Sequence, residues 1–129
     1  MTSKPKPPSS EPAIRVVMMP RDTNAEGTIF GGVILSLIDQ AAYVEAVRQA
    51  HRRYVTVAMD KIEFLQPVFV GDVLSLYAQA VKVGRSSMTI KVRVSARRRL
   101  NPDQIVGVTE AEVVFVALND DNKPAPIFE

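Results

Sequence analysis

The sequence predicts an α+β domain in which a curved antiparallel sheet wraps around one long helix. Apolar residues recur at helical spacing over a single long stretch, from about Thr28 to Arg52. After it the spacing changes to two in four segments joined by short links, and one short strand precedes it. Short links favour antiparallel neighbours, and a twisted sheet has to bury its apolar face. The helix is therefore expected to fill the curl of the sheet, in the order β-α-β-β-β-β.

The chain of 129 residues has the length of one domain. Residues 1–12 contain four prolines with Ser and Lys, a composition that buries too little apolar surface to become ordered. We therefore expect a flexible tail at 1–12 and a single domain over 13–129. No apolar run reaches the roughly 18 residues of a membrane span, and the N-terminus has no signal-like apolar region. A cytoplasmic protein with no membrane partner is expected.

Cysteine and histidine usage narrows the chemistry. The chain has no cysteine, which excludes disulfides, thiolate catalysis and most zinc sites. Its one histidine, His51, stands beside two arginines at an expected helix end, where a cation favours the helix dipole. A Ser-His-Asp triad and a dehydratase with a histidine acid are therefore disfavoured, and neither a metal nor a cofactor is expected. Carboxylates, amides and backbone groups have to carry any catalysis.

The net charge of +2 permits an anionic ligand without requiring nucleic acid. Basic residues cluster late, in KVGR and ARRR, but without the interleaved aromatic residues on which bases stack. Nucleic acid is not an expected partner.

A short strand, a polar loop and the long helix come first along the chain. The segment AIRVVMM, 13–19, predicts a strand that Pro20 ends. The loop DTNAEGTIFGG, 22–32, holds three glycines and offers Asn24 or Thr28 as the helix N-cap.

One face of this helix is apolar in the first half and polar in the second half. In the second half this face is polar and is expected to be solvated, with Glu45, Arg48, Gln49 and Arg52. In the first half the same face is apolar, with Ile34, Ile38 and Ala41, and the opposite stripe is polar, with Ser36, Asp39, Gln40 and Tyr43. A front half without a solvent face has to be covered on both sides, most simply by its own sheet and a second subunit.

Four segments after the helix are expected to be strands, at 54–65, 73–83, 86–98 and 105–118. The first changes phase near Asp60, which predicts a bulge, and the second is apolar enough for burial on both faces. The third alternates cleanly and places five side chains inside, namely Met88, Ile90, Val92, Val94 and Ala96. Residues 119–129 are expected to form a polar tail.

Two long stretches resemble a known family. MPRDTNAEGTIFGGVILSLIDQAA and VTVAMDKIEFLQPVFVGDVLSLYAQAVKVGRSSMTIKVRV are similar to the acyl-CoA thioesterases of the YciA-like and cytosolic acyl-CoA hydrolase group, from about residue 14 to 118. The pattern D-T-N-x-x-G-x-I-F-G-G, with an aspartate seven residues later, is the most specific part. The resemblance implies a hot-dog fold and the hydrolysis of fatty acyl-CoA to free fatty acid and CoA, with CoA present only as part of substrate and product.

The same resemblance implies a catalytic pair, Asn24 and Asp39, contributed by opposite subunits of a dimer. It also implies a larger homo-oligomer, a trimer of dimers, with active sites at the dimer interface. The alternative is a non-catalytic acyl-CoA-binding hot-dog module, which the loss of Asn24 or Asp39 would have favoured.

The residues themselves suit thioester chemistry. Gly31 and Gly32 leave the N–H groups of the first helical turn open to an oxyanion, although they also suit close helix-sheet packing. Asp39 activates water, attacks the thioester to form an anhydride, or belongs to a structural network, and the sequence does not separate these roles. Asn24 orients a carbonyl or water, or is a turn residue. Thr56 has its hydroxyl opposite the Val55 and Val57 side chains and is a weaker candidate for substrate binding.

Binding of CoA requires cations and hydrogen-bond donors for its phosphates. Arg85, Ser86 and Ser87 follow Gly84 in a tight turn that supplies both. Arg97 and Arg98 begin a second basic cluster, which is also typical of a solvated surface. The acyl chain is expected to run between the Ile- and Leu-rich front halves of two paired helices.

Overall fold

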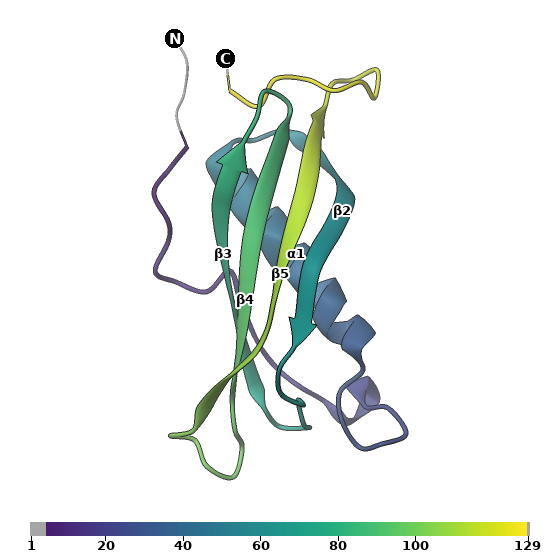
Figure 1. Cartoon of the computed structure of the whole chain (residues 1–129), viewed down its shortest axis with the longest axis vertical. Coiled ribbons are helices and arrows are strands. Elements are labelled where there is room, and N and C mark those ends of the chain that lie inside the picture. Colours follow the sequence, from purple (N-terminus) through teal and green to yellow (C-terminus); the bar gives the residue numbers. More distant parts are fainter. Residues whose placement is uncertain (1–4, 129) are drawn as a thin grey trace.

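One long helix packs against a five-stranded antiparallel sheet, as predicted (Figure 1). The computed structural model describes residues 5–128. The elements are β1 (Ile14–Val17), α1 (Gly31–Gln49), β2 (Arg53–Phe64), β3 (Val73–Val83), β4 (Ser87–Arg97) and β5 (Ile105–Leu118). The last four agree closely with the strands predicted from the sequence.

The strand order is β1-β3-β4-β5-β2, with all neighbours antiparallel. Pairing of consecutive strands was a correct prediction for β3, β4 and β5 and a wrong one for β2. This strand pairs with β5 at the edge of the sheet opposite β1. Residues 65–72 lead from β2 to β3 across the sheet and pass beside the loop before α1. Val68 in this crossing is buried, and its carbonyl accepts the N–H of Ile29 at 2.8 Å. The crossing thus closes one end of the core and anchors the loop before α1.

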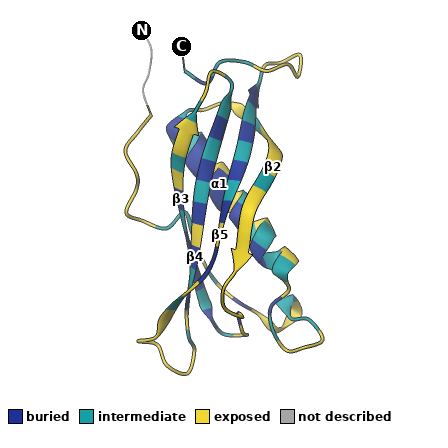
Figure 2. Ribbon diagram, viewed as in Figure 1, coloured by how far each residue is buried: buried dark blue, intermediate teal, exposed yellow. Residues whose placement is uncertain are grey.

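The core lies between α1 and the inner face of the sheet (Figure 2). The five inward residues predicted for β4 are all buried, and the alternation of its burial is visible along the strand. Ile34 and Ile38 of α1 pack into this core and are almost fully shielded from solvent. The apolar front of the helix therefore serves the core of its own chain.

Strand β2 is a long, exposed edge with two irregularities. Its register with β5 shifts between Thr56 and Ala58 and again between Asp60 and Glu63, so the bulge predicted near Asp60 is confirmed. Lys61 there has a positive φ of 55°. Several apolar side chains remain exposed along this edge, including Val55, Val57, Ile62 and Phe64.

The helix is shorter than predicted at both ends. It begins at Gly31 with Phe30 as N-cap, so the two caps suggested by the sequence are wrong. Asn24 and Thr28 instead close a small hairpin of their own, in which the Asn24 N–H donates to the Thr28 carbonyl at 2.8 Å. At the other end Ala50 is already extended.

The rear polar face of α1 is not solvated as predicted, because the N-terminal segment covers it. Glu45 and Gln49 are only 3% and 5% exposed. The Lys6 N–H donates to Gln49 Oε1 at 2.6 Å, and Arg48 donates both to the Pro7 carbonyl and to Glu45. Polar groups at these positions thus hold the chain of residues 6 and 7 against the helix. Residues 1–4 lie outside the described residues, and the flexibility of 5–12 stays a prediction.

The C-terminal segment also differs from the expected polar tail. It turns at Asn119, and the Ile127 side chain enters the core. The Ile127 N–H donates to the Arg85 carbonyl at 2.8 Å. The segment thereby covers the hairpin between β3 and β4.

Candidate functional site

Asp39 lies in the middle of α1, on the side that faces the edge strand β2. Its Oδ1 accepts a hydrogen bond of 2.8 Å from the Thr56 hydroxyl. One carboxylate oxygen is thereby oriented, while the other accepts no hydrogen bond from residues 5–128. Thr56, the weaker candidate of the sequence analysis, is thus the side chain that the fold brings to Asp39.

A cavity of about 370 Å³ opens beside this pair. Beyond Asp39 and Thr56 its walls are largely aromatic and aliphatic, with Tyr43 and Val44 from α1, Tyr54 from β2 and Phe115 from β5. The rings of Tyr43 and Tyr54 both meet Phe115 edge to face, at centroid distances of 6.3 and 6.0 Å. A carboxylate therefore stands at the mouth of an apolar space.

Sequence reasoning missed Tyr54 and Phe115. Tyr54 is two residues before Thr56, and alternation along a strand puts both on one side. This signal was present in the sequence. The meeting of Phe115 with the rings of Tyr43 and Tyr54 depends on the pairing of β2 with β5, which the sequence did not reveal.

The start of α1 supplies free backbone donors. Gly31 and Gly32 are its first two residues, and their N–H groups donate to no acceptor within residues 5–128. A Cβ added at Gly32 would meet nothing within 4 Å, and one at Gly31 would make only ordinary contact with the Phe64 ring at 3.5 Å. Close packing within this chain therefore does not explain these glycines, and their role toward an oxyanion stays a prediction.

The Asn24 side chain makes three hydrogen bonds within the loop before the helix. Its Oδ1 accepts the N–H groups of Glu26 and Thr28, at 2.8 and 3.2 Å, and its amide donates to the Thr28 hydroxyl at 2.9 Å. Gly27 completes the turn with a φ of 83°. The side chain thus shapes the loop, and its role toward a substrate stays a prediction.

The predicted catalytic groups fall into two separate places within one chain. Gly31 borders a second cavity of about 310 Å³, with Phe64 and Leu65 among its walls, whereas Asp39 borders the first. Eight residues of α1 separate Gly31 from Asp39, a rise of about 12 Å. A single carbonyl group does not reach both.

The residues predicted to bind CoA also lie apart. Arg85, Ser86 and Ser87 occupy the hairpin between β3 and β4, at the opposite end of the molecule from Gly31 (Figure 1). The Gly84 N–H donates to the Ser87 carbonyl at 2.8 Å, so the expected tight turn is present. Arg97 is exposed, and its guanidinium donates to the Pro102 carbonyl.

Arg98 has a structural role in the fold. Its guanidinium donates to Asp72 Oδ2 at 2.6 Å and to the Pro67 carbonyl at 3.0 Å, and it lies 5.1 Å from the centre of the Phe69 ring. Asp72 is 2% exposed and also accepts the Phe69 N–H at 2.9 Å. This ion pair fastens the crossing segment to the end of β4.

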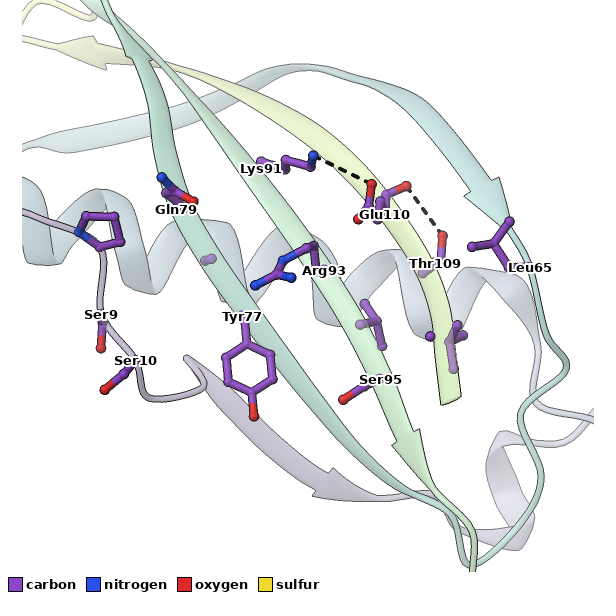
Figure 3. Close-up of a pocket in the computed structure, with 15 residues that line it drawn as sticks. Ser9, Ser10, Leu65, Tyr77, Gln79, Lys91, Arg93, Ser95, Thr109 and Glu110 are labelled. Atoms are coloured by element: carbon purple, nitrogen blue, oxygen red, sulfur yellow. Dashed lines mark hydrogen bonds and ion pairs between the residues drawn. The ribbon is translucent and has the colours of Figure 1, made fainter. Parts of the chain in front are cut away.

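A third cavity, of about 410 Å³, is larger than the two others described above and lies on the outer face of the sheet (Figure 3). Tyr77, Lys91, Arg93 and Glu110 project into it, and Ser9 and Ser10 border it. It contains none of the predicted site residues. Size alone therefore does not locate the chemistry.

Within residues 5–128, no helix is both long and apolar enough to cross a membrane, and no three acidic or histidine side chains gather as a metal site requires.

Comparison with known proteins gives consistent matches. The thioesterase superfamily profile matches residues 26–102. An uncharacterized acyl-CoA thioester hydrolase of Zymomonas mobilis is 48% identical over 97% of this chain and 83% of its own. The acyl-CoA thioester hydrolase YciA of Salmonella typhimurium is 40% identical over 98% of this chain and 97% of its own. A hexameric hotdog fold thioesterase of Campylobacter jejuni superposes with a TM-score of 0.86, at 42% identity, over 92% and 90% of the two chains.

Proposed function

This chain belongs to the thioesterase superfamily, and we propose that it hydrolyses fatty acyl-CoA to free fatty acid and CoA at a site built around Asp39. The fold is the hot-dog fold that the resemblance implied. The single observation that carries the site assignment is the carboxylate of Asp39, oriented by Thr56 at the mouth of an apolar cavity.

The active site is formed between two copies of the chain. The free N–H groups of Gly31 and Gly32 and the carboxylate of Asp39 are about 12 Å apart along α1, too far to act on one carbonyl. When two helices lie antiparallel about a two-fold axis, the start of one lies beside the middle of the other. Gly31 and Gly32 of one protomer then face Asp39 of its partner, with Asn24 shaping the loop at the oxyanion end.

The edge strand β2 is the surface that joins these copies. It is 12 residues long, and no other strand within residues 5–128 pairs with its outer edge. Val55 and Val57 are exposed on either side of Thr56, and Val57 lies within the first register shift. An unpaired apolar edge next to an incomplete site supports dimer formation through β2.

The reaction needs only protein groups and water. As a base, Asp39 takes a proton from water, and the resulting hydroxide attacks the thioester carbonyl carbon. The oxygen becomes an oxyanion that Gly31 and Gly32 stabilise through their N–H groups, and the C–S bond breaks as the CoA thiolate leaves and gains a proton. As a nucleophile, Asp39 forms an anhydride that water then hydrolyses. Both routes proceed without a cofactor.

Arg85, Ser86 and Ser87 remain our candidates for the phosphates of CoA, and Arg97 is a further one. These residues lie far from Gly31 in the same chain, so they act on a CoA bound by a neighbouring copy. Arg98 is excluded from this proposal because its guanidinium is largely buried in an ion pair with Asp72, whereas Arg97 is exposed.

Several solved relatives are hexameric, among them the Campylobacter jejuni thioesterase and a thioesterase from Yersinia pestis that is 40% identical to this chain with a TM-score of 0.85. This supports a homohexamer built as a trimer of dimers. A cytoplasmic location is part of the proposal, since acyl-CoA is made and used inside the cell.

Release of free thiol from acyl-CoA esters of several lengths tests this function. Asp39→Asn is expected to lower kcat by roughly 10²- to 10⁴-fold while CoA still binds. Asp120→Asn makes the same chemical change at an exposed turn and is expected to leave kcat unchanged. Equal turnover in the Asp39 variant and the wild type would remove Asp39 from the chemical step. Binding of acyl-CoA without any thiol release would favour the non-catalytic acyl-CoA-binding module.

A further inference from the structure

The walls of the cavity beside Asp39 indicate where the acyl chain ends. The sequence suggested that the chain runs along the apolar front half of α1. Ile34 and Ile38 are 2% and 0% exposed and pack into the core, so they do not line such a path. Leu35 and Leu37 are half-buried, and their contact with an acyl chain stays a prediction. The apolar side chains that α1 presents beyond Asp39 are Tyr43 and Val44, which are 47% and 45% exposed.

Tyr43 lies directly beyond the reacting group. It follows Asp39 by four residues, so both stand on one face of the helix, separated by a rise of about 6 Å. Both line the same cavity of about 370 Å³. An acyl chain whose carbonyl is held near Asp39 and which extends along the helix therefore meets the Tyr43 ring within one helical turn.

The cavity wall behind Tyr43 is fixed. Phe115 is 2% exposed and belongs to the core, and the Tyr54 hydroxyl donates to the Ala50 carbonyl at 2.7 Å. Tyr43 meets Phe115 edge to face but makes no side-chain hydrogen bond within residues 5–128. It is therefore an exposed part of the wall whose ring no side-chain hydrogen bond fixes within residues 5–128.

We propose that Tyr43 is a specificity-determining residue that closes the acyl end of the site, so that the enzyme prefers short acyl chains that end against its ring. This inference rests on the proposed thioesterase function. The class of substrate is a CoA ester of a short, unbranched acyl group, for which the Asp39 carboxylate and the Tyr43 ring mark the two ends of the binding space.

Three variants test the proposal through kcat/KM for straight acyl-CoAs of increasing length. Tyr43→Ala opens the closed end and is expected to raise the ratio of long-chain to short-chain kcat/KM by at least about tenfold, since one methylene in an apolar pocket is worth 10- to 200-fold. Tyr43→Trp fills the same space and is expected to lower this ratio. Tyr43→Phe keeps the ring and is expected to leave the ratio unchanged.

Two outcomes overturn the proposal. One is a Tyr43→Ala enzyme with the wild-type ratio, and the other is an equal loss of kcat/KM at all lengths, which would assign Tyr43 to positioning or folding. Affinities for non-hydrolysable acyl-CoA thioethers of the same lengths are measured in parallel. These affinities test the role of Tyr43 even when the wild type releases no thiol. Absence of thiol release would refute the proposed thioesterase function but not the role of Tyr43 in selecting acyl length. Oligomeric state is compared for all variants.

Discussion

The buried ion pair between Arg98 and Asp72 gives a stability prediction that also separates structural from substrate-binding arginines. In Arg98→Met the apolar stem remains but the guanidinium is lost. The Asp72 carboxylate, 3% exposed, then keeps only the Phe69 N–H as a partner. Breaking a buried pair by removing one partner costs about 3–5 kcal/mol, and the lost contact with the Phe69 ring adds about 0.5–1 kcal/mol. Arg98 itself is 15% exposed, so we expect a loss near the lower end, about 3 kcal/mol.

Denaturant unfolding at one fixed protein concentration measures this loss, because assembly makes stability depend on concentration. Arg97→Met is the matched control, since Arg97 is exposed and its variant is expected to change the free energy of unfolding by less than about 0.5 kcal/mol. Adding Asp72→Asn to Arg98→Met removes the buried charge and is expected to restore part of the stability. Equal stability of the two single variants, or no recovery in the double variant, would refute this account.

Two further predictions concern the helix start and alkaline pH. Gly32→Ala is expected to stabilise the helix by up to about 1 kcal/mol, which a thermal shift assay measures. The same variant is expected to lower kcat for thiol release, because its methyl group enters the open space before the free N–H groups. Burial raises the pKa of Tyr54 above its ordinary value, against the opposing effect of Arg52. The stability from the neutral phenol is therefore complete below about pH 10 and declines as the pH rises through the raised pKa. Tyr54→Phe is expected to cost about 1 kcal/mol at neutral pH, through the lost bond to the Ala50 carbonyl, and to flatten the alkaline decline. An unchanged alkaline slope in pH-dependent unfolding would contradict this.

Local patterns in the sequence predicted local features of the fold well. Strand β4 has one buried face, so its period of two appears directly in the order of its residues. The phase change near Asp60 likewise marks a real bulge, because a bulge moves all later side chains to the other face.

Features that depend on distant contacts were not predictable in this way. Glu45 and Gln49 have the polarity of a solvated face, and only the approach of Lys6 and Pro7 buries them. The same limit applies to β2, whose partner β5 lies far along the chain. For the candidate site, the sequence indicated Asp39 and Thr56 separately. Their contact follows from the assembled geometry, whereas the rise from the glycines to Asp39 follows from the helix itself.

The irregular shape of β2 also affects how newly made chains avoid aggregation. In a single chain, an edge of 12 residues with exposed apolar side chains is open to pairing with any extended polypeptide. The two register shifts, the second of which contains Lys61 at a positive φ, prevent this edge from being regular over its whole length. Only the first part, Arg53 to Thr56, precedes both shifts and offers a regular template for strand addition. The bulges thus disfavour open-ended stacking into fibrils while leaving one short segment for the closed, symmetric pair that we propose.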